Sequence, residues 1–422
     1  MPSASGKILI VGLGSAGDVH PNVGLGAALR ERGHRVVLLA STVFRPLGER
    51  AGLEFEGLGT DEQYHATLRD PEIWHPTRGF AAIARRGLLP AVRPTYEIIA
   101  RHYRPKGMMV AAPGIAFGAR IAQERLGVPL VTVHLQPVML RSRIAPPCFG
   151  FPDLIGLLPR PLRGAYYRFA DRIVIDPVLS GEINAFRAEL GLAPVRRFLD
   201  AWWHSPQLVV GLFPEFYAPP QPDWIPNVHL SGFPLWDESE VRTLSPEVES
   251  FLSTGDPPLV FTAGSAMAHG HSFFEVSAEV CRTLGARGVF LTQFPEQLPA
   301  RLPEGVRHFH YVPFSAILPR AAAFVHHGGI GTTAQALAAG VPQLVVPLAH
   351  DQPDNALRVK RLGVGDFLLP KRYTKEIAVE RLKTLIASAS VRRSCRELVP
   401  RMDPRAALEE ACARIEGLLA QS

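Results

Sequence analysis

Short apolar runs recur along the chain, each followed by glycine or polar residues. Lys7–Gly12 (KILIVG) comes first, then a helical pattern from Pro21 to Arg32 that stops at Gly33, then a second apolar run, Arg35–Ala40. Near-continuous apolar character is typical of parallel strands that are buried on both faces. The order strand, helix, strand predicts a βαβ unit, and we therefore expect an α/β protein.

The same alternation continues and then restarts beyond a proline-rich segment, 214–237. Further predicted strands are Met108–Ala112, Pro129–Val133, Gln207–Phe213, Val228–Ser231, Pro258–Ala263, Gly288–Thr292, Arg307–His310, Ala322–Val325 and Gln343–Pro347, with helices at Phe117–Leu126 and Ile183–Leu190. Segment 140–165, rich in proline and arginine, is predicted to be irregular. We expect a first domain over 1–220, a linker over 221–240, a second domain over 241–400, and a C-terminal amphipathic helix over 401–422 that packs on the first domain.

One stretch, 324–355, has the pattern of a phosphate site. The predicted strand Ala322–Val325 ends at His326-His327, and glycines follow at 328, 329 and 331. Thr332-Thr333 then open a helical pattern that stops at Gly340. Glycines allow close approach of the backbone, and the free N–H groups and dipole of a helix N-terminus favour an anion.

A polar cluster follows the next predicted strand. His350, Asp351 and Gln352 come after Gln343–Pro347, at the edge of a parallel sheet where ligands bind. An anion site beside groups that bind hydroxyls indicates a nucleotide-sugar.

The glycine motif near the N-terminus does not indicate a second phosphate site. Gly12-x-Gly14-x-x-Gly17 matches the dinucleotide fingerprint formally, but Asp18 would place a negative charge against the pyrophosphate. The second strand also lacks the acidic residue that binds ribose. Asp18 is instead a candidate general base toward an acceptor hydroxyl; the competing interpretation is an N-cap of the helix that begins near Pro21.

Composition limits the remaining possibilities. The four cysteines form no CxxC pair, and neither a signal peptide nor a membrane-spanning run is evident, so we expect a cytoplasmic protein. The net charge of the chain is +6, and it is unevenly distributed: segment 81–172 is basic, with 14 Lys/Arg and 4 Asp/Glu. That segment is either a solvated face or a peripheral contact with a membrane surface or an anionic acceptor; it lacks a nucleic-acid fingerprint. His269-x-His271 and His308-x-His310 have no third ligand at a suitable spacing, so no metal site is expected.

The motifs Gly14–Pro21 (GSAGDVHP), Thr262–Ser265 (TAGS), Tyr311–Phe314 (YVPF) and His327–Gln352 are similar to those of the family 1 glycosyltransferases. Within that family, the chain most resembles bacterial rhamnosyltransferases of rhamnolipid biosynthesis, on Asp70–Phe80 and Trp202–Trp236. The resemblance implies the GT-B fold, with two Rossmann-like doubly wound domains that face a central cleft. It also implies an inverting, metal-independent transfer with no cofactor other than the nucleotide-sugar co-substrate.

The resemblance also assigns roles. His327 would hold the diphosphate together with Ser265 and the turn residues Gly329, Gly331, Thr332 and Thr333. Asp351 and Gln352 would bind donor-sugar hydroxyls, and His350 would line the donor pocket. Tyr311 stands where many relatives have a base-stacking Trp, and Val312 would offer its backbone to the pyrimidine. Asp18 occupies the position of the base.

Departures from the family pattern bear on the donor. Gln335 replaces a Glu that often binds both ribose hydroxyls, which favours dTDP over UDP because the dTDP sugar lacks the 2′-hydroxyl. Phe314 replaces a common Gln, and no Asp near Ala111-Ala112 supports the base. The expected reaction is L-rhamnosyl transfer from dTDP-L-rhamnose to a 3-hydroxy fatty acid dimer.

Three alternatives remain at this point. One is a UDP-glucose-dependent enzyme acting on phenolic, macrolide or sterol-like aglycones; the others are an epimerase and a non-catalytic nucleotide-sugar-binding subunit. Candidate acceptor contacts are Trp74, Phe80, His134, Phe149 and Phe151, although core packing explains the aromatic ones equally well.

Overall fold

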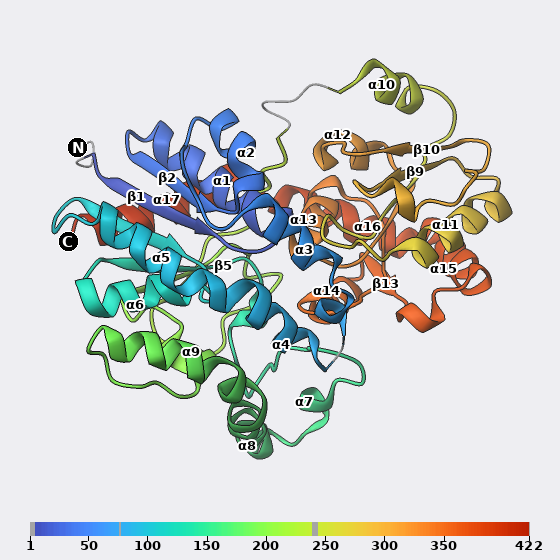
Figure 1. Cartoon of the computed structure of the whole chain (residues 1–422). Helices are drawn as coiled ribbons and strands as arrows, with labels where there is room; N and C mark the ends of the chain where they lie inside the picture. Colours follow the sequence, from blue (N-terminus) through green and yellow to red (C-terminus); the bar gives the residue numbers. More distant parts are fainter. Residues whose placement is uncertain (1–4, 76, 239–243, 422) are drawn as a thin grey trace. The chain divides into compact units, whose positions relative to one another are not determined.

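The computed structural model describes residues 5–75, 77–238 and 244–421. It divides the chain into two compact units. Unit 1 contains Met1–Pro234 and Pro404–Ser422, and unit 2 contains Leu235–Asp403. The boundary between them lies within the proline-rich segment, and the last helix of the chain belongs to unit 1 (Figure 1).

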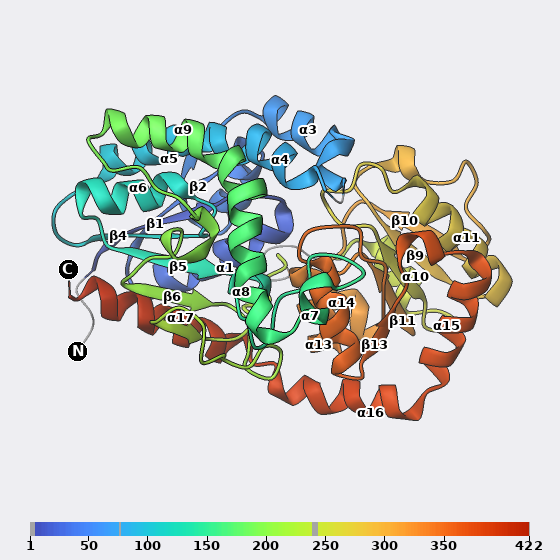
Figure 2. The same ribbon diagram turned by 90° about the horizontal axis from the view of Figure 1, so that it is seen from below.

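Unit 1 is built on a seven-stranded sheet in the order β3-β2-β1-β4-β5-β6-β7, and its neighbouring strands pair in parallel. Its strands are β1 Lys7–Gly12, β2 Arg35–Ala40, β3 Glu54–Gly57, β4 Met108–Ala112, β5 Leu130–His134, β6 Leu208–Gly211 and β7 Val228–Leu230. Its helices are α1 Ala16–Glu31, α2 Arg45–Arg50, α3 Asp61–Arg69, α4 Gly79–Ile83, α5 Leu89–His102, α6 Phe117–Leu126, α7 Leu154–Leu157, α8 Arg160–Ala170, α9 Asp176–Glu189 and α17 Pro404–Leu419. Figure 2 shows α5, α6 and α9 on one face of this sheet and α1 and α17 on the other.

Unit 2 contains a six-stranded parallel sheet in the order β10-β9-β8-β11-β12-β13. Its strands are β8 Leu259–Thr262, β9 Gly288–Leu291, β10 Val306–Phe309, β11 Ala323–His326, β12 Gln343–Val345 and β13 Gly365–Phe367. Its helices are α10 Pro246–Leu252, α11 His271–Leu284, α12 Phe314–Ile317, α13 Ile330–Ala339, α14 Gln352–Arg361, α15 Lys375–Ala387 and α16 Ala389–Leu398. Two doubly wound parallel sheets confirm the predicted α/β class.

The apolar runs form the centre of each sheet because they are covered on both faces. Ile8, Leu9, Ile10 and Val11 of β1 have no exposed surface, and Phe324 and Val325 of β11 have none either. Removing such side chains from water stabilises the fold by about 1.5–3 kcal/mol each. This is why the strongest apolar runs were predicted correctly as strands.

The predicted start of the first helix is wrong. Helix α1 begins at Ala16, five residues before Pro21, with Ser15 as its N-cap. The Asp18 carboxylate accepts a hydrogen bond from the Ser15 N–H, which completes a capping box and stabilises this earlier start. Pro21 is therefore inside the helix, and Asn22 Nδ2 nearby donates to the Asp18 carbonyl at 2.8 Å.

Two further predictions need correction. Segment 140–165 is not wholly irregular, because α7 and the start of α8 lie within it. The edge strands β3 and β13 were missed, since EFEG and GDF lack the continuous apolar character of central strands. An edge strand is covered less completely and leaves a weaker pattern in the sequence.

Candidate active site

The candidate residues gather where the direction of strand order reverses in each sheet. In unit 1 the order reverses between β1 and β4, and in unit 2 between β8 and β11. Loops at the carboxyl ends of strands flank a crevice at such a point, where open α/β sheets bind ligands. Asp18 follows β1, Ser265 follows β8, and His327 follows β11.

Asp18 lies in the first turn of α1 and is held by three donors. Its Oδ2 accepts from the Ser15 backbone N–H at 2.8 Å and the Ser15 hydroxyl at 3.1 Å. Its Oδ1 accepts from Gln136 Nε2 at 3.4 Å, a residue that follows β5. These donors fix the orientation of the carboxylate, which is also a capping group of α1. It is not the N-cap residue that the sequence offered as an alternative.

The environment of Asp18 changes its acidity in two opposing ways. Burial raises its pKa above the ordinary value, and the hydrogen bonds from Ser15 and Gln136 oppose that rise. Gly14 makes the close approach possible: its φ is +121°, and a Cβ there would lie 2.3 Å from Asp18 Oδ2. The second glycine of the fingerprint therefore accommodates a carboxylate.

The loop after β11 leads into the N-terminus of α13, where the sequence predicts an anion site. Gly329 is the N-cap of α13, and Thr333 N donates to Gly329 O at 2.9 Å, so the N–H groups before Thr333 have no partner within the helix. The His327 ring lies against Gly264 and Gly329, where an added Cβ would come within 2.8 and 2.5 Å of the ring. Glycine at these two positions lets both loops close around the imidazole.

Two buried polar atoms at this turn have no hydrogen-bond partner among the described residues. They are His327 Nδ1 and Thr333 Oγ1. Burial lowers the pKa of His327 to about 4, so its ring is neutral at pH 7 and carries one N–H. A neutral donor that is already desolvated is suited to hydrogen-bond an incoming phosphate.

His326, by contrast, is part of the scaffold. Its Nδ1 accepts from Gly328 N at 3.1 Å, which fixes the tautomer, and its Nε2 then donates to Gln343 Oε1 at 3.0 Å. The ring is fully buried and stacks on Phe324. It supports the end of β11.

Asn355, which the sequence analysis did not single out, connects the turn after β11 with the loop after β12. It is fully buried, and its Nδ2 donates to Gly328 O at 2.8 Å and to Asp351 Oδ2 at 2.7 Å. Asp351 is the N-cap of α14. The hydrogen bond from Asn355 fixes the orientation of its carboxylate. The sequence analysis predicted no helix here, so the spacing of four residues that places Asp351 and Asn355 on one side of the start of α14 was not recognised.

The loop from 346 to 352 is held by Gln352 and bent at His350. Gln352 Oε1 accepts from Leu348 N at 2.7 Å and Ala349 N at 3.1 Å. His350 has a φ of +62°, an uncommon backbone conformation for a residue with a side chain. Burial lowers its pKa to about 4, so it too is neutral at pH 7.

Two family models match the chain. The glycosyltransferase family 28 N-terminal domain matches residues 8–144, and the erythromycin biosynthesis protein CIII-like C-terminal domain matches residues 275–418. O-mycaminosyltylonolide 6-deoxyallosyltransferase of Streptomyces fradiae is 32% identical, over 97% of this chain and 97% of that protein. This chain belongs to the family 1 glycosyltransferases of GT-B fold.

Solved structures of glycosyltransferases have the same fold. The glycotransferase of kitacinnamycin superposes with a TM-score of 0.73 at 21% identity, covering 98% of this chain and 99% of that one. Spinosyn rhamnosyltransferase SpnG, complexed with thymidine diphosphate, gives a TM-score of 0.66 at 18% identity, covering 96% and 99%. The chain is thus a nucleotide-sugar glycosyltransferase, and the epimerase and binding-subunit alternatives lose their support.

The residues predicted to bind the nucleoside of the donor also belong to unit 2. Tyr311 is 38% exposed, and its hydroxyl donates to Asp237 O. Val312 belongs to the apolar core, so only its backbone is available to a ligand. Gln335 is buried on α13, and its Nε2 donates to Leu235 O at 3.2 Å, which occupies one of its two N–H donors. Ser265 is exposed on the loop after β8.

The acceptor candidates of unit 1 fall into two groups. Phe80 packs against an apolar core cluster, and His134 is 1% exposed with its ring against Trp203 and His204. Trp74 and Phe151 are half-buried, and Phe149 is exposed.

No group of three or more His, Cys, Asp or Glu side chains suited to a metal ion occurs among the described residues. In the same part of the chain, none of the helices combines the length and apolar character needed to cross a bilayer.

Proposed function

We propose that this glycosyltransferase transfers an L-rhamnosyl group from dTDP-L-rhamnose, with inversion, to a hydroxyl of an apolar acceptor such as a 3-hydroxy fatty acid dimer. The observation that carries the reaction type is Asp18, a carboxylate oriented by Ser15 and Gln136 whose pKa is raised by burial. A base with a raised pKa is better matched to work near neutral pH than an ordinary Asp.

The chemistry divides between the units. Asp18 in unit 1 takes the proton of the acceptor hydroxyl, and the oxygen attacks the anomeric carbon of the donor. The bond from that carbon to the diphosphate breaks, and the α13 N-terminus and the His327 N–H in unit 2 stabilise the charge on the leaving oxygen. These donors supply the role that a cation has elsewhere, and we propose that no metal or other cofactor is required.

Two observations support the proposed donor, one on the transferred sugar and one on the residue expected to contact the ribose of the nucleotide. The Streptomyces relative is named for a 6-deoxyallosyl group, and rhamnose is also a 6-deoxyhexose. Gln335 replaces a carboxylate that would accept from two ribose hydroxyls, and one of its N–H groups is already used by Leu235. Asp351, oriented by Asn355, and Gln352 are the proposed contacts of the sugar hydroxyls.

For the acceptor, we propose contacts with Trp74, Phe149 and Phe151, because Trp74 and Phe151 are only half-buried and Phe149 is exposed. The competing function is glycosylation of a macrolide or sterol-like aglycone with a UDP-sugar. The acceptor in this alternative is favoured by the names of two relatives, the tylonolide transferase and a sterol 3-beta-glucosyltransferase of Saccharomyces cerevisiae that is 27% identical over 90% of this chain. The chain covers 32% of that yeast protein.

A crossed substrate screen tests the proposal. The full chain is offered dTDP-rhamnose, dTDP-glucose and UDP-glucose against 3-hydroxy fatty acid dimers, a macrolide aglycone and phenols, with and without EDTA. We expect turnover with dTDP-rhamnose and the fatty acid dimer, unchanged by EDTA. Turnover confined to UDP-glucose and phenols would exclude the rhamnosyl assignment.

The base is tested with Asp18→Asn, which should lower kcat by about 10²–10⁴-fold. The matched control is Asp61→Asn, which removes a carboxylate from the first turn of α3 instead. Burial raises the Asp18 pKa, so its charge opposes folding at neutral pH, and thermal unfolding of the variant should show no loss of stability. Unchanged turnover would mean that Asp18 is not the base.

We further propose that the protein is cytoplasmic and contacts a membrane surface peripherally through unit 1.

A further inference from the structure

The exposed apolar side chains of the protein are concentrated in one segment. Among the described residues, seven of the nine large apolar side chains that are exposed lie between Phe149 and Val174. Leu157 is 75% exposed and Phe169 is 63% exposed. Such clustering on a protein surface marks a site of interaction, whereas single exposed apolar residues need no explanation.

Helix α8 and the π-helical turn η5 (Asp171–Ile175) that continues it present an apolar face outward. Leu162, Phe169 and Ile173 are spaced by seven and four residues, so they share one face of the helix. The buried residues Tyr167 and Asp171, four residues apart, form the opposite face. The helix therefore has apolar residues where a surface helix normally has polar ones.

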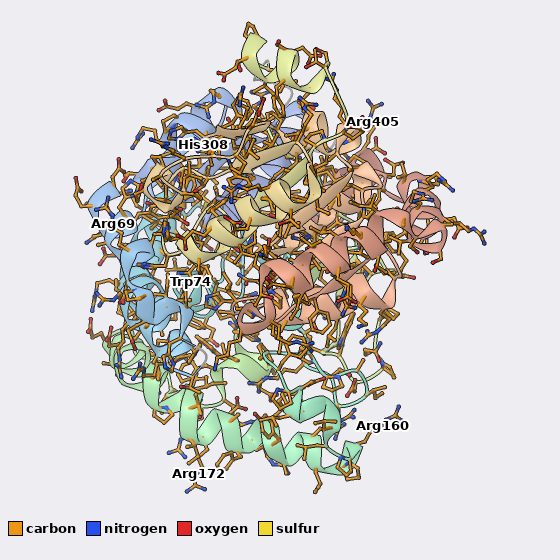
Figure 3. All side chains as sticks on the ribbon, turned by 90° about the vertical axis from the view of Figure 1, so that its right-hand side faces the viewer. Arg69, Trp74, Arg160, Arg172, His308 and Arg405 are labelled. Atoms are coloured by element: carbon orange, nitrogen blue, oxygen red, sulfur yellow. The ribbon has the colours of Figure 1, made fainter. Side chains whose placement is uncertain are left out.

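Arginines flank this apolar face. Arg160, Arg168 and Arg172 are exposed, and no ion pair connects them to any residue that the structure describes. Figure 3 shows Arg160 and Arg172 pointing away from the ribbon at the two ends of this segment. The other arginines of the basic segment 81–172 are in several cases already paired, as Arg93 is with Glu189 and Arg101 with Glu56.

Acidic groups do not offset these charges. Segment 140–174 contains six arginines and two aspartates. Asp153 accepts from Gly156 N at 2.9 Å as the N-cap of α7, and Asp171 is completely buried. The outer face of the segment is therefore both apolar and positively charged.

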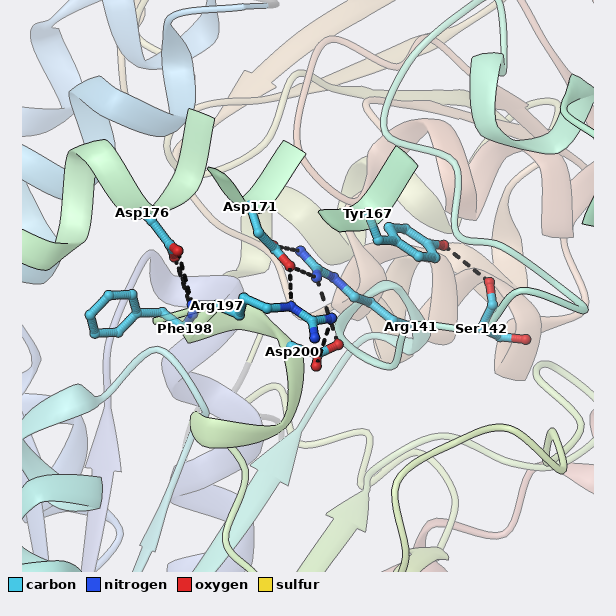
Figure 4. A network of polar contacts seen from close by, with 8 residues as sticks. All are labelled: Arg141, Ser142, Tyr167, Asp171, Asp176, Arg197, Phe198 and Asp200. Atoms are coloured by element: carbon cyan, nitrogen blue, oxygen red, sulfur yellow. Dashed lines mark hydrogen bonds and ion pairs between the residues drawn. The ribbon is translucent and has the colours of Figure 1, made fainter. Parts of the chain in front are cut away.

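A network of ion pairs and hydrogen bonds connects α8 and η5 to neighbouring parts of unit 1 (Figure 4). Asp171 accepts from Arg141 Nη1 and Nη2 at 2.9 and 2.7 Å and from Arg197 Nε at 3.3 Å. Arg197 also pairs with Asp200 at 2.9 Å. Tyr167 donates to Ser142 O at 3.0 Å. Tyr167 and Asp171, which make these contacts, are both buried, and the apolar face of the helix opposite them is left outward.

We propose that this α7–η5 surface binds the face of an anionic phospholipid bilayer. It consists of Leu154, Leu157, Leu162, Phe169, Ile173 and Val174, with Arg160, Arg168 and Arg172 at its margin. The apolar side chains enter the boundary between headgroups and acyl chains, and the guanidinium groups pair with lipid phosphates. The combination selects a bilayer over nucleic acid, because phosphate contacts alone would not use six exposed apolar side chains.

The inference does not depend on the proposed reaction, and its test needs no substrate. Flotation of the full chain is measured with vesicles of phosphatidylcholine alone and of phosphatidylcholine mixed with phosphatidylglycerol, at low and high salt. We expect binding to the anionic vesicles at low salt and weaker binding at high salt.

Two triple variants separate the contributions. Arg160→Gln/Arg168→Gln/Arg172→Gln should weaken binding to anionic vesicles by about 100-fold, since each cation near such a surface contributes about 1 kcal/mol. Leu162→Gln/Phe169→Gln/Ile173→Gln should weaken binding at either salt concentration. The control triple, Arg372→Gln/Arg393→Gln/Arg396→Gln, removes three exposed charges from unit 2 and should bind as the parent does.

Three outcomes would overturn the proposal. The first is that the parent fails to float with anionic vesicles at low salt. The second is that the control triple loses binding as much as the α7–η5 triples do. In the third, sedimentation shows a dimer that the apolar triple dissociates, with no binding to vesicles, which would assign the surface to a second copy of the chain. Activity toward a water-soluble acceptor should be retained in both α7–η5 variants, which verifies that they fold.

Discussion

At the scale of single residues, Asp18 combines an observed structural role with the proposed role of base. Its carboxylate completes the capping box of α1 through the Ser15 N–H, and the same interaction aims it. Burial disfavours its charge while three hydrogen bonds favour it, so its acidity is set by a balance of opposed effects. Each donor is therefore expected to tune the pH at which the enzyme becomes active.

Replacing Gln136 should shift the pH dependence of the reaction. In the proposed mechanism Asp18 acts as a base only when it is ionised, so kcat/KM should rise as pH increases through the pKa of Asp18. Gln136 donates to the ionised form, and Gln136→Leu should raise the pKa of Asp18 further. The acidic limb of the kcat/KM profile then moves to higher pH.

Gln123→Leu is the control variant for the pH profile. It also removes a half-buried amide of unit 1, but that amide donates to Ser205 and Gln207 and not to Asp18. A limb that moves to lower pH, or an equal shift in Gln123→Leu, would contradict the assigned role of Gln136.

At the scale of elements, the proposed donor site of unit 2 consists of two loops that one buried side chain connects. β11 and β12 are adjacent parallel strands, so the turn 327–329 and the loop 346–351 leave the same edge of the sheet. Asn355 on α14 connects them by donating to Gly328 O and Asp351 Oδ2. The sheet brings the loops near each other, and this amide fixes their spacing.

Asn355→Ala should therefore affect both stability and donor binding. A buried carbonyl and a carboxylate lose their donor, which should lower the free energy of unfolding by about 1–3 kcal/mol. The KM for the nucleotide-sugar should rise more than kcat falls, because the diphosphate turn and Asp351 are both released. Chemical denaturation and steady-state kinetics measure the two effects.

Asn184→Ala provides the matched comparison, since Asn184 makes two hydrogen bonds to the Val195 backbone in unit 1. It should lose stability by a similar amount while the donor KM stays unchanged. If both variants raise the donor KM equally, Asn355 has no special relation to the site.

At the scale of the whole chain, unit 1 is completed only by the last helix. Glu416 of α17 accepts two hydrogen bonds from Arg32 at 2.7 Å each, and His34 Nε2 lies 3.1 Å from Glu416 Oε1. Ile415 and Cys412 of the same helix are fully buried. Segments separated by nearly the full length of the chain thus form one folding unit.

The ion pair between Arg32 and Glu416 should make the stability of unit 1 depend on pH in a defined way. The hydrogen bonds from Arg32 lower the pKa of Glu416, so the pair stabilises the fold above the unfolded pKa and is lost as pH falls through the folded pKa. Glu416→Gln should lower the free energy of unfolding by about 1 kcal/mol at pH 7, and the difference from the parent should vanish at low pH.

Glu409→Gln, which changes an exposed carboxylate on the same helix, is the control and should have a smaller effect. A difference between Glu416→Gln and the parent that persists unchanged at acidic pH would show that packing of α17, rather than the ion pair, is responsible.

The sequence by itself determined the α/β class, the central strands and the two glycine turns. These depend on local patterns: continuous apolar runs for strands buried on both faces, and glycine where the backbone must approach a ligand or a side chain. Residues in such patterns, Lys7–Gly12 and His327–Thr333 among them, carry their signal in adjacent positions.

Only the tertiary structure decided which distant groups act on those turns. Gln136 reaches Asp18 because β5 and β1 belong to one sheet, and Asn355 joins two loops because β11 and β12 pair. The outward apolar face of α8 likewise depends on which of its side chains the rest of unit 1 buries. Hydrogen bonding and burial are set by neighbours in space, and a local pattern of residues does not contain them.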